Sequence, residues 1–387
     1  MLTRFCERCE RQTVDGHLWC PERDCPAEAG YPIFKYGDYL GDLKITKLVT
    51  VYRHAAIYAA ERNEEPVWVK VAHTAPDCDE RLKREAQALE PVARAANRTP
   101  KWMRGFMRKP RQSLPILLPP YPAPSKRPYG EITFRGETKV FMVFQPFEGV
   151  ILADLLKENP QLWHYEVAWI VTHIAEQMRP WVSRGLLHLS LTPDVILVDR
   201  DKQAHWRAAL LDLGWLVSPT DAQALGQALD RCEPAYTAPE VLVARTGVQV
   251  TPASDVHSLG LVTYEMLSGR PGFEPKLLRD ERVRRAVTQN RAVLPVERPE
   301  LEGAGVVKIV ERATALTDRF PNLLEFARAL IAIYGPQPKE VRPLPIRTYL
   351  VLALVVLILV IVLGVAAYLL YQVAVLNPNV APVATPQ

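Results

Sequence analysis

The chain has 387 residues, which is too long for one small domain and leaves room for accessory segments beside a larger one. Its formal net charge of +4 is spread over the whole sequence, and so mild a balance does not by itself indicate a nucleic-acid partner. The 34 prolines lie in loops and linkers, where they lengthen connections without indicating disorder throughout.

Four cysteines form two pairs near the N-terminus: Cys6, Cys9, Cys20 and Cys25. Pairs on short turns can hold four thiolates around zinc, and a closed site of this kind is structural rather than catalytic. So short a segment cannot bury a core, and metal binding would supply on the order of 10–16 kcal/mol of its folding free energy. Residues 1–29 are therefore predicted to form a zinc ribbon, with two disulfides or unrelated free thiols as the alternatives.

Between residues 33 and 335, short segments of recognisable type follow one another in a fixed order. They are a turn around residues 50–55, a strand Val67–Ala72, a helix Arg81–Leu89, and then Phe141–Gly149, Gly185–Asp199, Leu210–Gly214, Tyr236–Glu240, Ser254–Gly260 and Asp318–Pro321. The strand is similar to the V-A-I-K element of a protein kinase, and later segments are similar to its D-F-G and A-P-E elements. In this order the segments resemble the protein kinase family in its bacterial Ser/Thr form.

The resemblance implies an α+β chain with a two-lobed, protein-kinase-like fold. A β-rich N-lobe is expected over residues 33–147 and an α-helical C-lobe over residues 148–335. Within the C-lobe, the resemblance implies a buried ion pair between Glu240 and Arg319, and a bracing role for Asp255 beneath the catalytic loop. These expected roles are structural and carry no information about catalysis.

The catalytic-loop segment keeps the apolar frame of the family motif H-R-D-L-x-x-x-N and loses its chemistry. His188 stands at the His position, but Ser190 replaces the catalytic Asp and Val195 the metal-binding Asn. Thr192 stands where Ser/Thr kinases usually carry a phosphate-contacting Lys, and Leu189 replaces the Arg that receives an activation-loop phosphate in many relatives. Ser190 is too weak a base at neutral pH to stand in for a carboxylate. Phosphoryl transfer is therefore expected to be lost.

The nucleotide site is expected to be weak as well. Three positions where glycines would let backbone N–H groups close on phosphates carry side chains. They are Thr50, Tyr52 and Ala55. If any nucleotide binds, the resemblance implies that Lys70, Glu85 and Asp212 hold it, with Asp212 as the one remaining metal ligand. ATP and magnesium are therefore expected to bind weakly or not at all, and the Lys70–Glu85 pair is interpreted as fixing the helix against the sheet.

The C-terminal part contains a long uncharged run, Tyr349–Tyr371, that is rich in Leu, Val and Ile and can span a bilayer core of ~30 Å. Lys339, Arg342 and Arg347 precede the run and no charged residue follows Arg347, so the positive-inside rule keeps the N-terminus in the cytoplasm. The prediction is a single-pass protein of the cell membrane, with its kinase-like domain cytoplasmic. Its predicted parts are a Pro-rich basic linker (336–347), a transmembrane helix (348–372) and a short extracytoplasmic tail (373–387).

The segment Arg94–Arg111 is rich in Arg and Lys and contains no acidic residue. Basic residues near an anionic leaflet contribute about 1 kcal/mol each before screening. A solvated loop explains the same composition, because charge runs often form soluble faces. Whether this segment touches lipid stays open.

These features predict a membrane-anchored pseudokinase that acts as a signalling scaffold and binds an unidentified cytoplasmic protein. One alternative is a divergent but active ATP-dependent Ser/Thr protein kinase that uses Lys70 and Asp212 with a displaced carboxylate. A second alternative is a zinc-ribbon nucleic-acid binder, whose affinity would fall steeply with salt. Membrane tethering makes nucleic acid the less natural partner.

Overall fold

The computed structural model describes residues 3–6, 12–14, 30–97, 113–120, 127–200, 205–243, 249–273, 280–289, 298–301, 305–338 and 346–376. The chain divides into two compact units. One is formed by Met1–Ala96 and Gln112–Lys339, and the other by Asn97–Arg111 and Glu340–Gln387. The first unit contains both lobes, and the second contains the C-terminal helix.

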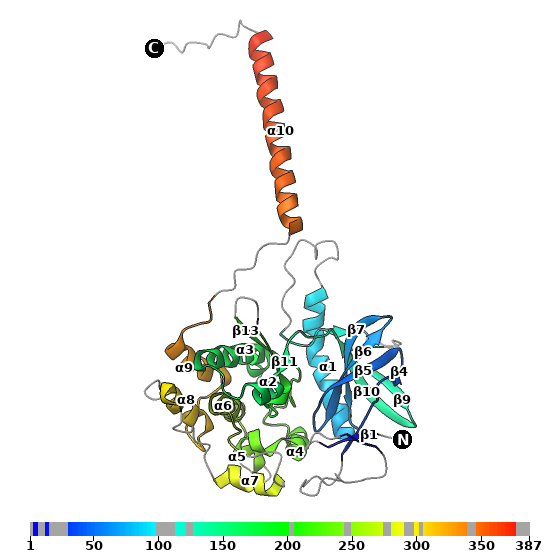
Figure 1. Ribbon diagram of the computed structural model, residues 1–387, viewed down its shortest axis with the longest axis vertical. Helices are drawn as coiled ribbons and strands as arrows, with labels where there is room; N and C mark the ends of the chain where they lie inside the picture. The colour runs from blue at the N-terminus through cyan, green and yellow to red at the C-terminus, as the bar shows by residue number, and fades with distance from the viewer. Residues whose placement is uncertain are drawn as a thin grey trace. The chain divides into compact units, whose positions relative to one another are not determined.

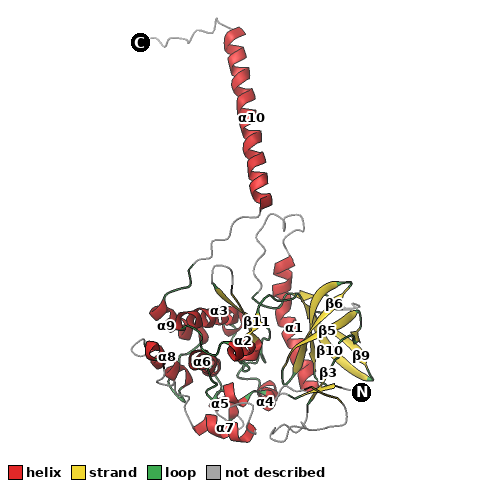
Figure 2. Cartoon of the chain, viewed as in Figure 1, coloured by secondary structure: helices red, strands yellow, loops and turns green. Residues whose placement is uncertain are grey.

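The N-lobe is built on a seven-stranded antiparallel sheet (Figures 1 and 2). Its order is β4-β5-β6-β7-β10-β8, and β9 also pairs with β10. The strands are β4 (Tyr39–Leu40), β5 (Leu43–Val51), β6 (Ala55–Arg62), β7 (Glu65–Ala72), β8 (Leu117–Leu118), β9 (Gly130–Phe134) and β10 (Glu137–Phe144).

One face of this sheet is covered by α1 (Pro76–Asn97). Alternate side chains of a strand point to opposite faces, so Lys70 on β7 faces α1 and Glu85, whereas Val69 and Val71 belong to the cluster on the other face. The buried stripe of α1 repeats at helical spacing. It consists of Leu82, Ala86, Leu89 and Ala93.

The other face of the sheet is covered by the N-terminal part of the chain. There β1 (Thr3–Phe5) pairs with β2 (Gln12–Val14) on one side and with β3 (Tyr31–Ile33) on the other. Phe5 and Phe34 pack against the apolar cluster of this face. The described N-terminal strands are therefore packed onto the N-lobe.

The C-lobe is mainly helical and carries one small sheet of order β11-β12-β13 (Figure 2). The strands are β11 (Val150–Ile151), β12 (Ile196–Arg200) and β13 (Trp206–Leu210). The helices are α2 (Leu152–Glu158), α3 (His164–Val182), α4 (Ala222–Arg231), α5 (Pro239–Leu242), α6 (Pro252–Ser268), α7 (Asp280–Gln289), α8 (Val306–Thr314) and α9 (Leu323–Tyr334). Short 3-10 turns lie at Pro193–Val195, Pro234–Tyr236 and Pro299–Leu301. The sheet-rich first lobe and helical second lobe agree with the predicted α+β architecture.

Helix α6 forms the centre of the C-lobe, and most of its residues are buried. It begins with a capping box, in which the side chains of Thr251 and Ser254 satisfy each other's backbone N–H groups. It ends at Gly269, whose φ of 79° is the left-handed conformation that glycine adopts most easily. Asp255, in the first turn of α6, therefore has a fixed position beneath the catalytic loop.

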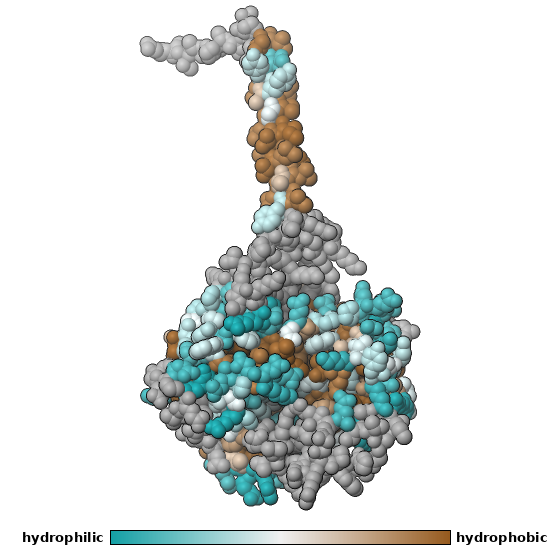
Figure 3. Space-filling view, in the orientation of Figure 1, coloured by the Kyte–Doolittle hydropathy of each residue, from teal (hydrophilic) through white to brown (hydrophobic). Residues whose placement is uncertain are grey.

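The second unit contains one long helix, α10 (Ile346–Leu376). Its stretch Tyr349–Val373 has 25 residues and a mean hydropathy of 3.4, which by length and composition is enough to cross a membrane. Figure 3 shows the middle of this helix as continuously hydrophobic, with paler, more polar side chains toward its two ends. The helix covers the predicted span 348–372, while most of the predicted linker and tail lies outside the described residues.

Candidate functional site

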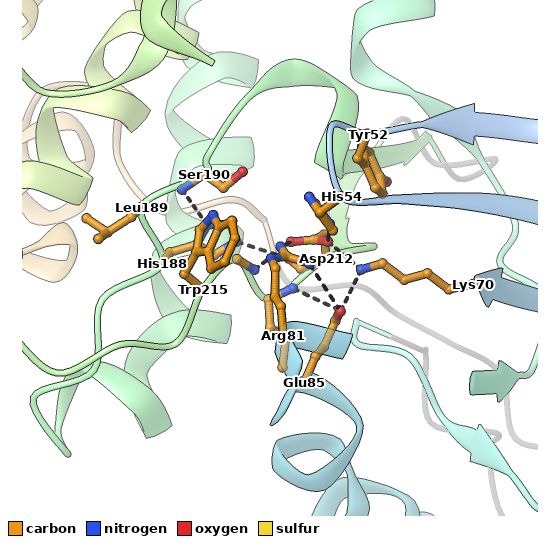
Figure 4. Close-up of polar contacts among 12 residues, drawn as sticks. Tyr52, His54, Lys70, Arg81, Glu85, His188, Leu189, Ser190, Asp212 and Trp215 are labelled. Atoms are coloured by element: carbon orange, nitrogen blue, oxygen red, sulfur yellow. Dashed lines mark hydrogen bonds and ion pairs between the residues drawn. The ribbon is translucent and has the colours of Figure 1, made fainter. Parts of the chain in front are cut away.

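The side chain of Asp212 lies at the centre of a buried cluster of charges (Figure 4). Lys70 donates hydrogen bonds to Asp212 and to Glu85, with Nζ 2.6 Å from Glu85 Oε2. Arg81, one helical turn before Glu85, donates to the other carboxylate oxygen of Asp212. All four side chains are withdrawn from solvent. The expected Lys70–Glu85 ion pair is therefore present, and Asp212 joins it.

The turn between β5 and β6 closes over this cluster. Its backbone forms a hairpin in which the N–H of Tyr52 donates to the carbonyl of Ala55 at 2.7 Å. His54 points inward, with Nε2 2.9 Å from Asp212 Oδ2, and its ring stacks on that of Tyr52 (Figure 4). The ring of Tyr52 in turn lies 5.4 Å from Lys70 Nζ. Buried rings thus occupy the space in which a glycine turn would bring backbone N–H groups to phosphates.

The charges of the cluster balance one another. Burial would raise the pKa of Asp212, but Arg81, Lys70 and His54 together hold that pKa well below its usual value. Burial raises the pKa of Glu85, and Lys70 opposes that rise. Burial also lowers the pKa of His54 well below 6.5, so the imidazole is neutral at physiological pH. Lys70 and Arg81 are therefore neutralised by Asp212 and Glu85 without any ligand.

A kinase-type magnesium ion does not fit this arrangement. Asp212 Oδ1 accepts from Arg81 and from the backbone N–H of Gly214 at 2.6 Å, while Oδ2 accepts from Lys70 and His54. Magnesium needs oxygen ligands in near-octahedral geometry. The ion would have to displace these donors and would lie beside two cations, and the buried side chain of Val195 offers it no oxygen.

A bulky side chain also occupies the strand next to Lys70. Trp68 stands where the V-A-I-K motif has alanine. Its rings lie 6.1 Å from the ring of Phe144, at the end of β10, and 5.9 Å from that of Phe147. This aromatic packing fills the space between β7 and the segment that leaves β10.

The degenerate catalytic positions support the backbone. His188 is fully buried, and its Nε2–H donates to the backbone carbonyl of Asp212 at 3.0 Å. Its Nδ1 accepts the N–H of Ser190 at 3.2 Å, and burial lowers the pKa of His188 to about 4, so the ring is neutral. Thr192 precedes the 3-10 turn that contains Val195, and both are buried. His188 therefore links the catalytic loop to the strand end that carries Asp212.

Leu189 stands at the Arg position of the H-R-D-L-x-x-x-N motif, where it provides an apolar side chain instead of a charged one. Its φ of 55° lies in the left-handed region, which is unfavourable for a residue with a side chain. The carboxylate of Asp255 accepts the N–H groups of His188 and Leu189, both at 2.8 Å, and so braces the loop as expected. The Leu189 side chain joins an apolar cluster with Trp215 and the inner face of α4. Apolar packing thereby orders the segment after Asp212.

Ion pairs tie the turn and α1 to the C-lobe. Arg53, beside His54, donates to Asp280 of α7 at 2.6 Å and to Glu233 at 2.8 Å. Arg231, at the end of α4, contacts Asp77 in the first turn of α1 at 2.8 Å. Together with the Asp212 cluster, these pairs hold the two lobes against each other.

A cavity of about 460 Å³ lies beside the closed turn. It is lined by residues of that turn, by α2 and by the catalytic loop, including Ser190 and Asp194. Among the described residues that line it, Lys70, Glu85 and Asp212 do not occur. The open space near the degenerate loop is thus separated from the residues predicted to hold nucleotide.

Two members of the cluster were missed by sequence reasoning, His54 and Arg81. Arg81 lies four residues before Glu85 on α1, so helical spacing alone places both on one face and could have identified it. The contact of His54 depends on the path of the turn, which sequence spacing does not give. The predicted C-lobe pair is present, because Arg319 binds both carboxylate oxygens of Glu240 at 2.6 Å.

Two other sequence predictions concern residues that are only partly described. Cys6 follows β1 and is buried, whereas the other predicted zinc ligands, Cys9, Cys20 and Cys25, lie outside the described residues. In the basic segment, Arg94 forms an exposed pair with Glu90 at 2.7 Å. Its remainder, residues 98–111, lies outside the described part of the chain.

Comparison with known proteins connects this architecture to kinases. A family profile described as "Protein kinase domain" matches residues 131–319. The serine/threonine-protein kinase drp72 of Corynebacterium efficiens is 28% identical over 209 residues, which cover 53% of this chain and 38% of that protein. The serine/threonine-protein kinase pkn2 of Myxococcus xanthus is 30% identical over 202 residues, which cover 50% of this chain and 23% of that protein. The chain therefore spans well under two thirds of the length of these relatives.

A solved structure gives the same fold. The kinase domain of PknI from Mycobacterium tuberculosis superimposes with a TM-score of 0.50 at 19% identity, covering 78% of this chain and 100% of that chain. At this identity the likeness shows the fold alone. The sequence matches and the two-lobed architecture together support the conclusion that this chain is protein-kinase-like, both in sequence and in fold.

Proposed function

We propose that this chain is a membrane-anchored pseudokinase, which has a kinase-like fold, binds a partner protein in the cytoplasm and does not transfer phosphate. The observation that carries the proposal is the engagement of both carboxylate oxygens of Asp212 by Arg81, Lys70 and His54. In phosphoryl transfer the corresponding acid holds a metal ion over the phosphates. Here the same carboxylate holds the lobes together.

The expected loss of rate and the expected loss of nucleotide affinity together favour an inactive protein over a slow kinase. A positioned general base contributes about 10²- to 10⁴-fold to a rate, and Ser190 cannot supply it. Breaking a buried ion pair costs about 3–5 kcal/mol. A nucleotide that has to open the Asp212 cluster would therefore bind roughly 10²- to 10⁴-fold more weakly than in a preformed site. Both costs apply to the same reaction.

The packing of the C-lobe supports a scaffold. The cluster of Leu189, Trp215 and α4 orders the segment after Asp212 without a phosphate, and Arg53 holds the turn to α7. A surface that does not depend on nucleotide or phosphorylation can present the same face to a partner protein at all times. The membrane anchor would keep that partner at the bilayer surface.

The alternative is an active ATP-dependent Ser/Thr kinase, which similarity to proteins named serine/threonine-protein kinases favours. The decisive assay incubates the full chain in lipid nanodiscs with radiolabelled ATP and magnesium. No incorporation above a Lys70→Met control is expected, and Ser190→Asp alone should stay inactive because the phosphates and metal are not held. Incorporation that disappears in Lys70→Met would establish the kinase instead.

The proposal includes the membrane anchor and the zinc ribbon. Because α10 spans the bilayer, carbonate should not extract the protein from membranes. Protease added outside the cell should leave the kinase-like domain intact. Residues 1–29 should bind one zinc ion through Cys6, Cys9, Cys20 and Cys25, so elemental analysis should find zinc that is lost after Cys20→Ser with Cys25→Ser. Steeply salt-dependent binding of nucleic acid would favour the ribbon as a nucleic-acid binder.

A further inference from the structure

A continuous group of aromatic rings lies where the N-terminal end of α3 meets the C-terminal end of α9. The rings of Trp163 and Tyr165 lie 6.5 Å apart, those of Tyr165 and Trp169 5.1 Å, and those of His164 and Tyr334 4.8 Å. His164 also contacts Tyr165 at 5.6 Å, so all five rings are connected. We call this group the aromatic patch.

The patch reaches the surface of the C-lobe. Trp163 is 56% exposed, and Ile333, the residue before Tyr334, is 39% exposed. The indole N–H of Trp169 donates to the carbonyl of Gly335 at 3.3 Å, which fixes the point where the chain leaves α9. In the described part of the chain, the indole N–H of Trp163 has no hydrogen-bond partner. Trp163 therefore presents an apolar ring with a free polar tip.

The position of the patch along the chain indicates what covers it. Only residues 336–345 separate Gly335 from the start of α10 at Ile346, and this length reaches at most about 36 Å when fully extended. The tether contains Lys339 and Arg342, which are attracted to anionic headgroups. If α10 spans the bilayer, the patch cannot move far from the headgroup layer.

From this geometry we infer that the aromatic patch docks on the headgroup layer of the membrane that α10 crosses. Trp and Tyr are enriched at this depth because their rings are apolar and their tips are polar. The tether gives the surface a high effective concentration, so even a weak docking contact is populated. In the docked state, the N-terminal end of α3 and the C-terminal end of α9 face the lipid, and the C-terminal end of α3 points away from it. This inference rests on the proposed membrane anchorage.

Fluorine NMR on the full chain tests the docking. The chain is labelled with fluorotryptophan, and each of its eight Trp signals is assigned by a Trp→Phe variant. The labelled chain is placed in nanodiscs of phosphatidylcholine and phosphatidylglycerol with gadolinium chelated at some headgroups. Trp181 is the internal control, because it is buried near the C-terminal end of α3, about 27 Å by helical rise from Trp163, the residue just before that helix. Gadolinium should enhance the fluorine relaxation rate of Trp163 roughly ten-fold or more over that of Trp181. The reason is that this enhancement falls with the inverse sixth power of the distance between the fluorine and the gadolinium ion.

Equal enhancement of Trp163 and Trp181 in nanodiscs that carry the chain would overturn the docking and leave the anchor intact. With that result, a partner protein would be the remaining candidate for covering the aromatic patch. A chain that does not copurify with nanodiscs would overturn both the anchor and the docking. A second variant, Tyr165→Ser with Ile333→Ser, should reduce the enhancement at Trp163 several-fold. Unchanged shifts of Trp181 and Trp215 in this variant would show that the fold is intact.

Discussion

The cluster around Asp212 and the pair of Glu240 and Arg319 are both buried sites of opposite charge, yet they differ in how their partners are supplied. At Glu240 the partner is the Arg that the kinase resemblance implies, and Ser254 adds a hydrogen bond at 2.7 Å. At Asp212 two of the donors, His54 and Arg81, come from positions to which the resemblance gives no role.

The two sites differ in the role that the kinase resemblance gives to the buried acid. The Glu240 pair fixes the chain after the catalytic segment and has a structural role whether or not phosphate is transferred. At the Asp212 site, both carboxylate oxygens accept hydrogen bonds from donors of the chain itself. A carboxylate kept from a catalytic motif is therefore not evidence of catalysis when buried cations already neutralise it.

The largest effect is expected when the acid of the first site is removed. Asp212→Ala leaves Lys70 and Arg81 buried with Glu85 as their one acidic partner in the cluster, so the free energy of unfolding should fall by about 5 kcal/mol. Chemical denaturation of the full chain in detergent micelles, followed by tryptophan fluorescence, measures this. A loss below about 1 kcal/mol would mean that Asp212 is not a structural residue.

Removing the cation of the second site should cost somewhat less. Arg319→Ala leaves Glu240 without its bidentate partner, but the Glu240 side chain is 16% exposed and water can reach it. A loss of about 3 kcal/mol is expected. Arg319→Lys is the matched control, and it should recover part of this loss because a lysine keeps the charge without the two parallel hydrogen bonds. Full recovery would show that geometry does not matter at this pair.

Acid should lower the free energy of unfolding, because a buried histidine lies near each of the two sites. Burial lowers the pKa of His188 to about 4 and that of His257, near Arg319, to about 3. Below the unfolded value of 6.5 the unfolded chain takes up protons that these buried rings do not, so stability falls with decreasing pH. Each ring should contribute about 1.4 kcal/mol per pH unit.

The variants His188→Leu and His257→Leu separate the two contributions to this slope. Each variant should reduce the slope of the free energy of unfolding against pH by the contribution of the histidine that it removes. His257→Leu is the cleaner change, because Nδ1 of His257 is buried without a hydrogen-bond partner in the described structure. An unchanged slope in His257→Leu would contradict the neutral, buried state assigned to that ring.

The smallest effect is expected at an exposed pair on the same helix as Arg81. Arg94 pairs with Glu90 at the surface of α1, with 73% of the Arg94 side chain exposed. Arg94→Ala should change the free energy of unfolding by less than about 0.5 kcal/mol. The same denaturation experiment measures it, and a larger loss would show that charge removal from α1 is harmful wherever it occurs.

Much of the fold follows from the sequence, because motif order and hydrophobic spacing are local signals. The strand with Lys70, the helix with Glu85 and the pair of Glu240 and Arg319 all lie where the motifs predict. The closed turn does not follow in the same way. The contact of His54 with Asp212 joins residues 158 positions apart, and it depends on the backbone path between β5 and β6.

The packing of the N-terminal strands was also beyond reach of the sequence. Nothing in the spacing of Phe5 or Phe34 indicates that these residues cover the outer face of the N-lobe sheet. Non-local packing of this kind is decided by the shape of both partners, whereas motifs report on one segment at a time.

Calorimetric titration of the full chain with ATP, with and without magnesium, tests the central claim most directly. Both carboxylate oxygens of Asp212 are already engaged by donors of the chain, so no magnesium-dependent heat is expected even at millimolar ATP. Micromolar, magnesium-dependent binding that is abolished by Asp212→Asn would contradict the account, because it would show that the cluster opens and that Asp212 still holds a metal ion.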